Sequence, residues 1–333
     1  MINLSENKTW LVTGCAGFIG SNILEFLLKN EQNVIGLDNF STGFQHNLDE
    51  VQNVVGMKKW QNFNFIKGDI RDFETCYNST KNVDIVIHQA ALGSIPRSIN
   101  DPLTTHNVNI TGLVNMLKAS SDNKIQRFVY ASSSSVYGDS TALPKKEHLI
   151  GNQLSPYAVT KYSNELYANV FAKSYNMETI GLRYFNVFGK RQDPHGAYAA
   201  VIPLWFKAIL NNEEVFINGD GETSRDFCYI DNVVEMNILC GLTNNKNAIN
   251  KIYNVACNEQ TTLNQLFHHI KQIINFNNNM KPTYRDYRNG DIRHSLADIS
   301  LAQELIGYNP KYKILDGLKL AANWYKDFFQ NKK

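Results

Sequence analysis

Short apolar runs alternate with longer amphipathic stretches through the first half of the chain. Runs of this kind predict strands buried on both faces, and the stretches between them predict helices. Because alternating strands and helices build a parallel sheet through right-handed crossovers, the pattern predicts a doubly wound α/β fold of the Rossmann type. The predicted strands cover residues 10–13, 34–37, 63–67, 84–88, 127–132 and 179–183.

The pattern changes after Asn186, where loops rich in glycine, proline and asparagine interrupt the alternation. A further apolar run at 251–255 would return to the large sheet as a strand, so we expect the second domain to be discontinuous in sequence. The predicted division assigns 1–185 and about 227–257 to a large domain, and 186–226 and about 258–333 to a smaller α/β substrate domain.

Composition narrows the class of protein. The chain has 333 residues, of which 43% are hydrophobic and 19% charged, with a formal net charge of +2. These values are typical of a globular protein with a sizeable core, and the absence of a sustained basic run argues against a nucleic-acid partner. The polar start of the chain and the lack of a long apolar stretch predict neither a signal peptide nor a membrane span, and hence a cytoplasmic protein.

Cysteine and histidine give no indication of a metal site. The five cysteines are widely spaced and include no Cys-x-x-Cys pair, so we expect buried, reduced thiols and no disulfide framework. The eight histidines lack the spacing of metal ligands. The sequence therefore predicts a function without a bound metal.

A glycine-rich turn follows the first predicted strand and opens a helix. Gly14 allows a tight turn, Gly17 lets the backbone approach a pyrophosphate, and Gly20 permits close packing of helix on strand. The amino terminus of the helix adds free N–H groups and a positive dipole. Asp38 ends the next predicted strand, where a carboxylate accepts hydrogen bonds from the adenosine ribose and repels a 2′-phosphate. The sequence therefore predicts NAD, not NADP, as the cofactor.

A tyrosine and a lysine lie four residues apart in the helix predicted over 156–174. Tyr157 and Lys161 therefore share one face of that helix. A tyrosine hydroxyl has an ordinary pKa of about 10, but an adjacent cation, the lysine or an oxidised nicotinamide, lowers it and makes the phenolate a usable base. Ser133, Ser134 and Ser135 follow the fifth predicted strand, at the sheet edge where hydroxyls could hydrogen-bond a reacting oxygen.

Together, the glycine-rich turn, the serine-ended strand and the Tyr-x-x-x-Lys pair resemble the extended short-chain dehydrogenase/reductase family, and the resemblance covers essentially the whole chain. It implies that Tyr157 is the base and that the Ser133 hydroxyl shares the proton. It also implies that Lys161 lowers the pKa of Tyr157 and holds the nicotinamide ribose. Ser134 and Ser135 are close enough to substitute for Ser133 or to assist it.

The family likeness implies further contacts with the cofactor. Tyr184 would pack near the nicotinamide. Asn109 matches a family asparagine near the cofactor, although a polar helix face explains this residue equally well. Other expected contacts lie in the first helical turn and at the carboxyl ends of strands: Phe18, Ile19, Asn39, Asp69, Ile70 and Ala90.

The residues after Ser133 bear on the reaction type. Family members that dehydrate or decarboxylate nucleotide sugars carry acidic residues at the positions of Ser134 and Ser135. Dehydration needs an acid to expel hydroxide and a base for the adjacent carbon, so two neutral hydroxyls favour oxidation and re-reduction at a single carbon. The resemblance thus favours epimerase chemistry.

The carboxyl-terminal half is similar to the bacterial UDP-N-acetylglucosamine 4-epimerases of surface-polysaccharide pathways, including lipopolysaccharide. The similarity rests on runs at 192–203, 218–227 and 288–295. Arg225 and Arg288 lie in these runs and suit a diphosphate, because a guanidinium binds phosphate oxygens bidentately. The resemblance implies that these arginines bind the nucleotide.

Asp291 would accept a hydrogen bond from the ribose of the nucleotide. The likeness places Ser295 where epimerases confined to non-acetylated hexoses carry a tyrosine, so its small side chain leaves room for an N-acetyl group. Arg97 could meet a carboxylate if the substrate were the uronic acid. The remaining expected contacts with substrate are Ser94, Asn186, Gln192 and Val201.

The resemblance implies an NAD-dependent 4-epimerase that interconverts UDP-N-acetylglucosamine and UDP-N-acetylgalactosamine, or their uronic acids, through a transient 4-keto sugar. A nucleotide-sugar 4,6-dehydratase or reductase of the same family is one alternative, and a non-catalytic NAD-sensing protein is another. The family likeness also suggests a homodimer built on two helices per subunit, at 102–120 and 156–174.

Overall fold

A seven-stranded parallel sheet forms the centre of the computed structural model, which describes residues 4, 6–195, 199–275, 280–287 and 292–330. The strand order is β11-β6-β5-β4-β1-β2-β3, so the chain winds outward in both directions from β1. This confirms the predicted doubly wound fold, including the late return of a strand to the sheet. The strands are β1 (Thr9–Thr13), β2 (Asn33–Asp38), β3 (Phe63–Lys67), β4 (Ile85–His88), β5 (Arg127–Ser133), β6 (Thr179–Tyr184) and β11 (Lys251–Val255).

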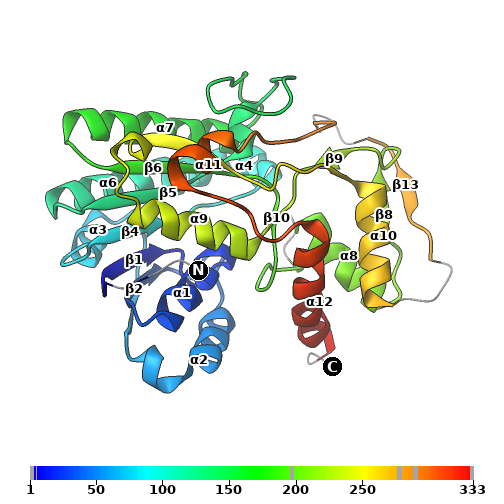
Figure 1. Cartoon of the computed structure of the whole chain (residues 1–333), viewed down its shortest axis with the longest axis horizontal. Helices are drawn as coiled ribbons and strands as arrows, with labels where there is room; N and C mark the ends of the chain where they lie inside the picture. Colours follow the sequence, from blue (N-terminus) through cyan, green and yellow to red (C-terminus); the bar gives the residue numbers. More distant parts are fainter. Residues whose placement is uncertain (1–3, 5, 196–198, 276–279, 288–291, 331–333) are drawn as a thin grey trace.

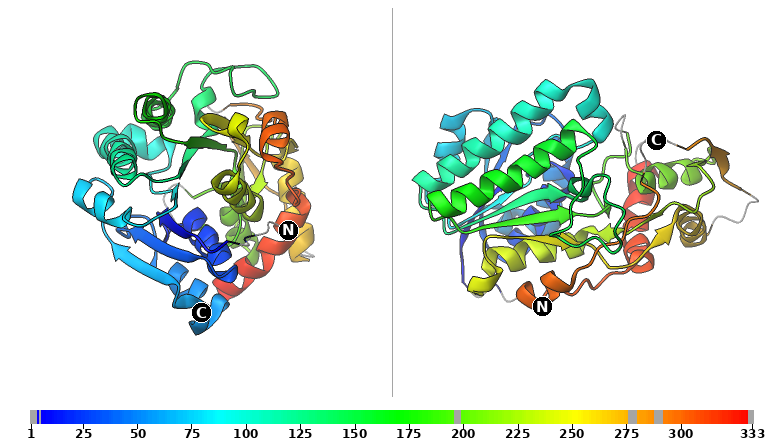
Figure 2. Two further views of the ribbon diagram at one scale, coloured as in Figure 1. Left: turned by 60° about the vertical axis from the view of Figure 1, so that its left-hand side comes forward. Right: turned by 90° about the horizontal axis from the view of Figure 1, so that it is seen from above.

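Helices cover both faces of this sheet (Figure 2). One face is covered by α1 (Phe18–Lys29), α2 (Gln45–Trp60) and α9 (Ile230–Leu242). The other is covered by α3 (Phe73–Ser79), α6 (Gly112–Asp122) and α7 (Pro156–Ser174), with the short helices α4 (Ile95–Asn100) and α5 (Pro102–His106) and a π-helical turn η1 (Asn107–Thr111) beside them.

The strands pack apolar side chains on each face. Trp10 and Val12 belong to the core under α1 and α9, while Leu11 and Phe128 belong to the core under α6 and α7. Neighbouring residues of one strand therefore pack into the cores on opposite faces of the sheet, as expected for a sheet covered on both sides.

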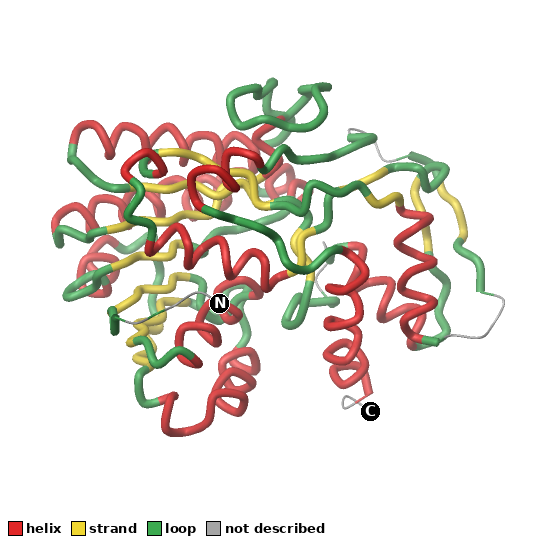
Figure 3. Tube along the Cα trace, viewed as in Figure 1, coloured by secondary structure: helices red, strands yellow, loops and turns green. Residues whose placement is uncertain are grey.

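The smaller part of the molecule lies beyond the carboxyl ends of the strands (Figures 1 and 3). It contains three two-stranded sheets and helices around them. The paired strands are β7 (Val187–Phe188) with β10 (Cys228–Tyr229), β8 (Phe216–Asn218) with β13 (Thr283–Arg285), and β9 (Ser224–Arg225) with β12 (Thr261–Thr262). The helices are α8 (Val201–Leu210), α10 (Leu263–Ile274) and α12 (Ile314–Gln330), whereas α11 (Ser300–Ile306) lies against β11 of the large sheet. The exact division into two domains stays a prediction.

A buried arginine joins the two parts of the molecule. Arg191 follows β7, and its guanidinium contacts Glu25 of α1 at 2.6 Å and Glu50 of α2 at 3.0 Å. Trp324 of α12 donates a hydrogen bond from its ring nitrogen to the same Glu50. Tyr325, also on α12, donates to the carbonyl oxygen of Gly189 at 3.2 Å. These contacts hold the loop after β7 against the helices that border the sheet.

All five cysteines are buried, as predicted. Within the described part of the chain, none of the helices is both long enough and apolar enough to cross a bilayer.

We predict that Gly20→Ala destabilises the fold. The added Cβ would lie 2.1 Å from the carbonyl oxygen of Gly14, so α1 would have to move away from the preceding turn. We expect the free energy of unfolding, measured by urea denaturation, to fall by about 1–3 kcal/mol, the usual cost of overpacking. Gly93→Ala is the control, because a Cβ there meets no atom within 4 Å. Equal stability of the two variants would contradict the prediction.

Candidate active site

The turn between β1 and α1 places backbone that carries no side chains, at Gly14 and Gly17, at the edge of the sheet. Gly14 has a φ of +69°, and its N–H donates to the carbonyl oxygen of Leu37 at 2.8 Å. Helix α1 begins at Phe18, and its N-cap Gly17 contributes no side-chain hydrogen bond. The first N–H groups of a helix have no partner within the helix, and here they border a cavity. This is the arrangement that receives a phosphate group.

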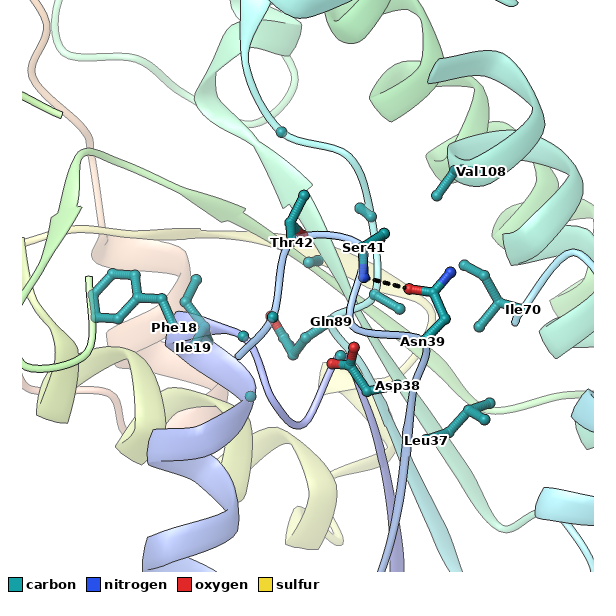
Figure 4. Close-up of a pocket in the computed structure, with 18 of the residues that line it drawn as sticks. Phe18, Ile19, Leu37, Asp38, Asn39, Ser41, Thr42, Ile70, Gln89 and Val108 are labelled. Carbon is teal, nitrogen blue, oxygen red and sulfur yellow. Dashed lines mark hydrogen bonds between the residues drawn. The ribbon is translucent and has the colours of Figure 1, made fainter. Parts of the chain in front are cut away.

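Asp38 lies at the end of β2, next to this turn. Its two carboxylate oxygens accept hydrogen bonds from the N–H groups of Ala16, at 2.9 Å, and Phe40, at 2.8 Å. Burial raises the pKa of Asp38, while these N–H donors act in the opposite direction. Figure 4 shows Asp38 and Asn39 on the wall of the cavity, between Ile19 and Ile70.

Asn39 and Asp69 connect the ends of β2 and β3. The Asn39 side-chain amide donates to Asp69 Oδ2 at 2.8 Å. Arg71 also donates to this carboxylate, and its hydrogen bonds lower the pKa of Asp69 to about 2. Asp69 is therefore ionised at neutral pH and is tied to groups on both sides of it.

These groups surround a cavity of about 350 Å³ along the carboxyl ends of the strands. Its shape and chemistry fit a dinucleotide: a glycine turn with no room for a Cβ lies beside an acidic strand end, and a phenol and an ammonium lie on α7. The predicted cofactor residues that line it are Gly14, Gly17, Phe18, Ile19, Gly20, Asp38, Asn39, Asp69, Ile70, Ala90, Tyr157, Lys161 and Tyr184.

Tyr157 and Lys161 lie in the first half of α7, whose start is set by local chemistry. The Ser155 side chain accepts a hydrogen bond from the Ala158 N–H, and Pro156 occupies the first helical turn, as predicted. The Lys161 ammonium donates to the carbonyl oxygen of Ala131 in β5 at 2.8 Å and lies 6.0 Å from the centroid of the Tyr157 ring. The fold thus holds the phenol and the ammonium together above β5.

Ser133 lies near Tyr157, and interaction with its hydroxyl lowers the pKa of Tyr157. Burial acts more strongly, however, and leaves the pKa of Tyr157 raised above its ordinary value. Burial also lowers the pKa of Lys161 to about 8, although the negative charge of Glu165 acts against it. In the protein alone the pKa of Tyr157 is therefore raised, because burial outweighs the interaction with Ser133, and an effect of Lys161 on this pKa stays a prediction.

Asn109 is buried in the π-helical turn behind the cavity wall. Its side chain accepts a hydrogen bond from the Leu92 N–H at 2.8 Å and donates to the Leu92 carbonyl oxygen at 3.0 Å. It also donates to the Thr160 hydroxyl at 3.1 Å. Asn109 therefore ties the loop after β4 to α7, one residue before Lys161, and a contact with the cofactor stays a prediction.

Two other predicted substrate residues, Ser94 and Gln192, make hydrogen bonds within the protein, whereas the Ser135 hydroxyl makes none with the described part of the chain. Ser94 has a φ of 94° and caps α4 by accepting a hydrogen bond from the Arg97 N–H. Gln192 donates to the carbonyl oxygen of Val187 at 2.9 Å. Ser134 and Ser135 lie in a 3₁₀ turn, η2 (Ser134–Tyr137), and the Ser135 hydroxyl oxygen is buried without a hydrogen-bond partner.

A second cavity, of about 550 Å³, lies in the smaller part of the molecule. Three predicted substrate residues line it: Asn186, Val201 and Arg225. Asn186 follows β6 only two residues after Tyr184, which lines the first cavity. The end of β6 therefore links the two cavities.

The 288–295 run is described only from residue 292 onward. Arg288 and Asp291 lie outside the described residues. Ser295 is half-buried, and its N–H donates to the carbonyl oxygen of Ser224 at 3.1 Å, so it lies beside the strand that carries Arg225.

Several cavity residues were not predicted from the sequence. Gln89, directly after β4, lines the first cavity and donates to the Tyr184 hydroxyl at 2.9 Å and to Asn237 at 3.0 Å. Its position after a strand was an available signal. In the second cavity, the Arg285 guanidinium lies 3.1 Å from the centroid of the Phe216 ring, and these residues come from neighbouring strands far apart in sequence.

Two solved structures are similar to this one over nearly their whole length. The UDP-N-acetylglucosamine 4-epimerase of Methanobrevibacter ruminantium, in complex with UDP-N-acetylmuramic acid, shares 38% identity with a TM-score of 0.89, over 97% of this chain and 99% of that one. The UDP-glucuronic acid 4-epimerase of Bacillus cereus, in complex with UDP-glucuronic acid and NAD, shares 30% identity with a TM-score of 0.86, over 96% and 99%.

Sequence comparison agrees with these structures. The UDP-glucose 4-epimerase of Mycolicibacterium smegmatis is 32% identical over 97% of this chain and 98% of its own length. The model of the NAD dependent epimerase/dehydratase family matches residues 10–256, which include the glycine turn, Asp38 and the Tyr-x-x-x-Lys pair. The resemblance to the extended short-chain dehydrogenases/reductases is thereby confirmed. The chain belongs to the NAD dependent epimerase/dehydratase family, and its cofactor is NAD.

Proposed function

We propose that the protein is an NAD-dependent UDP-sugar 4-epimerase that acts on UDP-N-acetylglucosamine and UDP-N-acetylgalactosamine or on their uronic acids. The observation that carries the proposal is that Tyr157 and Lys161 line the dinucleotide cavity, and that the end of β6 links this cavity to the one lined by Asn186 and Arg225. The names of the similar proteins support it, since they include 4-epimerases of three UDP-sugars.

In the proposed reaction, Tyr157 removes the proton from the hydroxyl on carbon 4, and the Ser133 hydroxyl hydrogen-bonds the same oxygen. NAD, which the glycine turn and Asp38 would hold in the cavity, would supply the group that takes the hydride from that carbon and returns it. Rotation of the resulting 4-keto ring about its phosphate link exposes the other face of the carbonyl, so the return of hydride inverts the configuration. Tyr157 then gives its proton back to the oxygen on carbon 4. The raised pKa of Tyr157 in the protein alone means that the positive nicotinamide must help to stabilise the phenolate.

The surroundings of Ser133 favour epimerisation over dehydration. Ser134 and Ser135 replace the acidic residues that dehydration requires, and no carboxylate stands at either position. The unpartnered hydroxyl oxygen of Ser135 is a neutral hydrogen-bonding group at this edge of the sheet.

The proposed nucleotide site uses Arg225 for the diphosphate, joined by Arg288 and Asp291 as the sequence predicts. Ser295, next to the strand that carries Arg225, leaves room for an N-acetyl group. Arg97 is the proposed partner of a carboxylate if the uronic acid is the substrate. The proposal includes both the N-acetylated sugars and their uronic acids. One similar protein is named as a UDP-N-acetylglucosamine 4-epimerase, and another as an epimerase of a uronic acid, UDP-glucuronic acid.

We also propose a homodimer in which α7 and α5 pack against their copies. Exposed apolar side chains form a stripe on α7 at Val159, Leu166, Tyr167 and Val170, and Leu103 extends it onto α5. Their spacing along α7 places them on one helix face. A stripe of this kind is typical of a helix that packs against another protein surface.

We predict that Tyr157→Phe lowers kcat by about 100-fold or more, because general base catalysis typically contributes that much. The measurement is interconversion of UDP-N-acetylglucosamine and its 4-epimer without added reductant. Tyr162→Phe, a loss of the same hydroxyl from the same helix, is the control and retains activity. Absence of any epimer with the wild-type protein, for all UDP-sugars offered, would instead favour the dehydratase, reductase or NAD-sensing alternatives.

We predict that Ser295→Tyr abolishes turnover of UDP-N-acetylglucosamine but spares UDP-glucose, because the larger ring fills the space for the N-acetyl group. Chromatographic separation of the epimers formed from each sugar measures the change, and Ser295→Ala should retain the wild-type preference. Loss of both activities, or of neither, would show that this position does not read the N-acetyl group.

We predict that Leu166→Asp converts the dimer to a monomer, because a charge buried without a partner is costly. Sedimentation velocity measures the change. Leu320→Asp is the matched control, since Leu320 on α12 is 47% exposed and Leu166 is 50% exposed. A wild-type protein that sediments as a monomer would overturn the proposed dimer.

A further inference from the structure

We propose that Glu165, held in place by Arg183, is a positioning residue that keeps Lys161 protonated and fixed beside Tyr157 during the reaction. This inference rests on the proposed function, since it assigns a role to a residue behind the proposed catalytic pair. Neither Glu165 nor Arg183 lines the dinucleotide cavity, so both would act through Lys161.

Glu165 belongs to a row of residues on α7 that contacts consecutive residues of β5. Tyr157, Lys161 and Glu165 follow one another at four-residue spacing on one helix face. Their partners in β5 are also consecutive. The Ala131 carbonyl oxygen accepts from Lys161 at 2.8 Å, and the Ser132 hydroxyl donates to Glu165 at 2.6 Å. Ser133, the next residue of β5, lies near Tyr157 and lowers its pKa. Glu165 therefore aligns the helix with the strand that carries the catalytic serine.

Arg183 fixes the direction of the Glu165 carboxylate. Its Nε and Nη2 donate to the two carboxylate oxygens at 2.8 and 2.7 Å, and both side chains are 3% exposed. The third nitrogen, Nη1, donates to the carbonyl oxygen of Glu147 at 2.9 Å. A bidentate pair of this kind has a defined orientation as well as a charge.

The charge of Glu165 offsets the burial of Lys161. Lys161 is 3% exposed, and burial of an ammonium favours its neutral form. Its pKa has fallen to about 8, and the negative charge of Glu165 opposes this fall. Without that charge, Lys161 would lose its proton close to neutral pH and with it the ability to stabilise the Tyr157 phenolate.

The other titratable groups around Lys161 in the described structure do not supply this charge. His88 of β4 is buried, and its pKa is lowered to about 3, so it is neutral at working pH. Tyr157 is protonated in the protein alone, because its pKa is raised. Tyr130 of β5 and Tyr137 of η2, which lie near the Glu165–Arg183 pair, also have raised pKa values and are neutral.

The pair is hard to explain by stability alone. Burying two charges costs free energy that their attraction only partly returns, and apolar side chains of similar size often serve a core as well or better. A carboxylate at this place has an effect that an apolar residue lacks, because it acts on the charge of Lys161 one helical turn away.

We predict that Glu165→Gln lowers the pKa of Lys161 by about one unit, the lower end of the usual effect of a nearby opposite charge. Activity requires protonated Lys161 and falls as the pH rises through its pKa, so the basic limb of the kcat profile should move to lower pH by the same amount. NMR titration of protein labelled in its lysine side chains measures the pKa directly, with the Lys161 signal assigned by its absence from Lys161→Met.

Two further variants separate this role from a structural one. Glu165→Asp keeps the charge and should keep the Lys161 pKa near its wild-type value, even if stability falls. Glu178→Gln breaks the Arg127–Glu178 pair at the opposite end of β5 and should leave the pKa and the pH profile unchanged. If Glu165→Gln does not fold, Glu165→Gln with Arg183→Met removes the unpaired guanidinium as well and should still lower the pKa.

The NMR titration needs no substrate, so the inference and the proposed function can fail separately. An unchanged Lys161 pKa in a folded protein that lacks the Glu165 carboxylate would overturn the inference while leaving epimerase activity intact. A wild-type protein that epimerises no UDP-sugar would overturn the proposed function, whatever the pKa of Lys161.

Discussion

The parallel direction of all seven strands is the constraint on which the site depends. Because every carboxyl end meets the same edge, four features distant in sequence are brought together: the glycine turn after β1, Asp38 at the end of β2, Gln89 after β4 and Ser132 near the end of β5. The smaller part of the molecule covers this edge, and the end of β6 continues from the dinucleotide cavity into the second cavity. The sheet thus places the two cavities next to each other along one edge.

Buried ion pairs hold the segments around this edge of the sheet together. Arg191 joins the loop after β7 to Glu25 and Glu50, and the Arg183–Glu165 pair joins α7 to β5 and β6. The Arg191–Glu25 and Arg183–Glu165 pairs are buried, so removing one partner of either would leave an unpaired buried charge, which is costly. The Arg183–Glu165 pair also affects the charge of the site, because the negative charge of Glu165 raises the pKa of Lys161.

Features with local causes could be predicted from the sequence. The Ser155–Pro156 start of α7, the glycine turn and the acid at the end of β2 each depend on a few neighbouring residues, and the structure has them where they were expected. Gln89 and the aromatic–arginine contact of Phe216 with Arg285 were missed, because their partners come from other strands and helices. Gln89 and Asn237, for example, are 148 residues apart. Asn109 was matched by likeness, but its contacts with Leu92 and Thr160 appear only once the loop after β4 is folded against α7.

The sequence by itself determined the doubly wound fold, the family and the cofactor, because hydrophobic period, turn residues and motif spacing are properties of short segments. Only the tertiary structure decided how the pKa values of Tyr157 and Lys161 are shifted. The four-residue spacing of Tyr157 and Lys161 indicated a lowered tyrosine pKa, whereas burial raises it and lowers that of Lys161. Burial and the approach of Glu165 depend on how helices and strands pack, and no segment of the sequence contains that information alone.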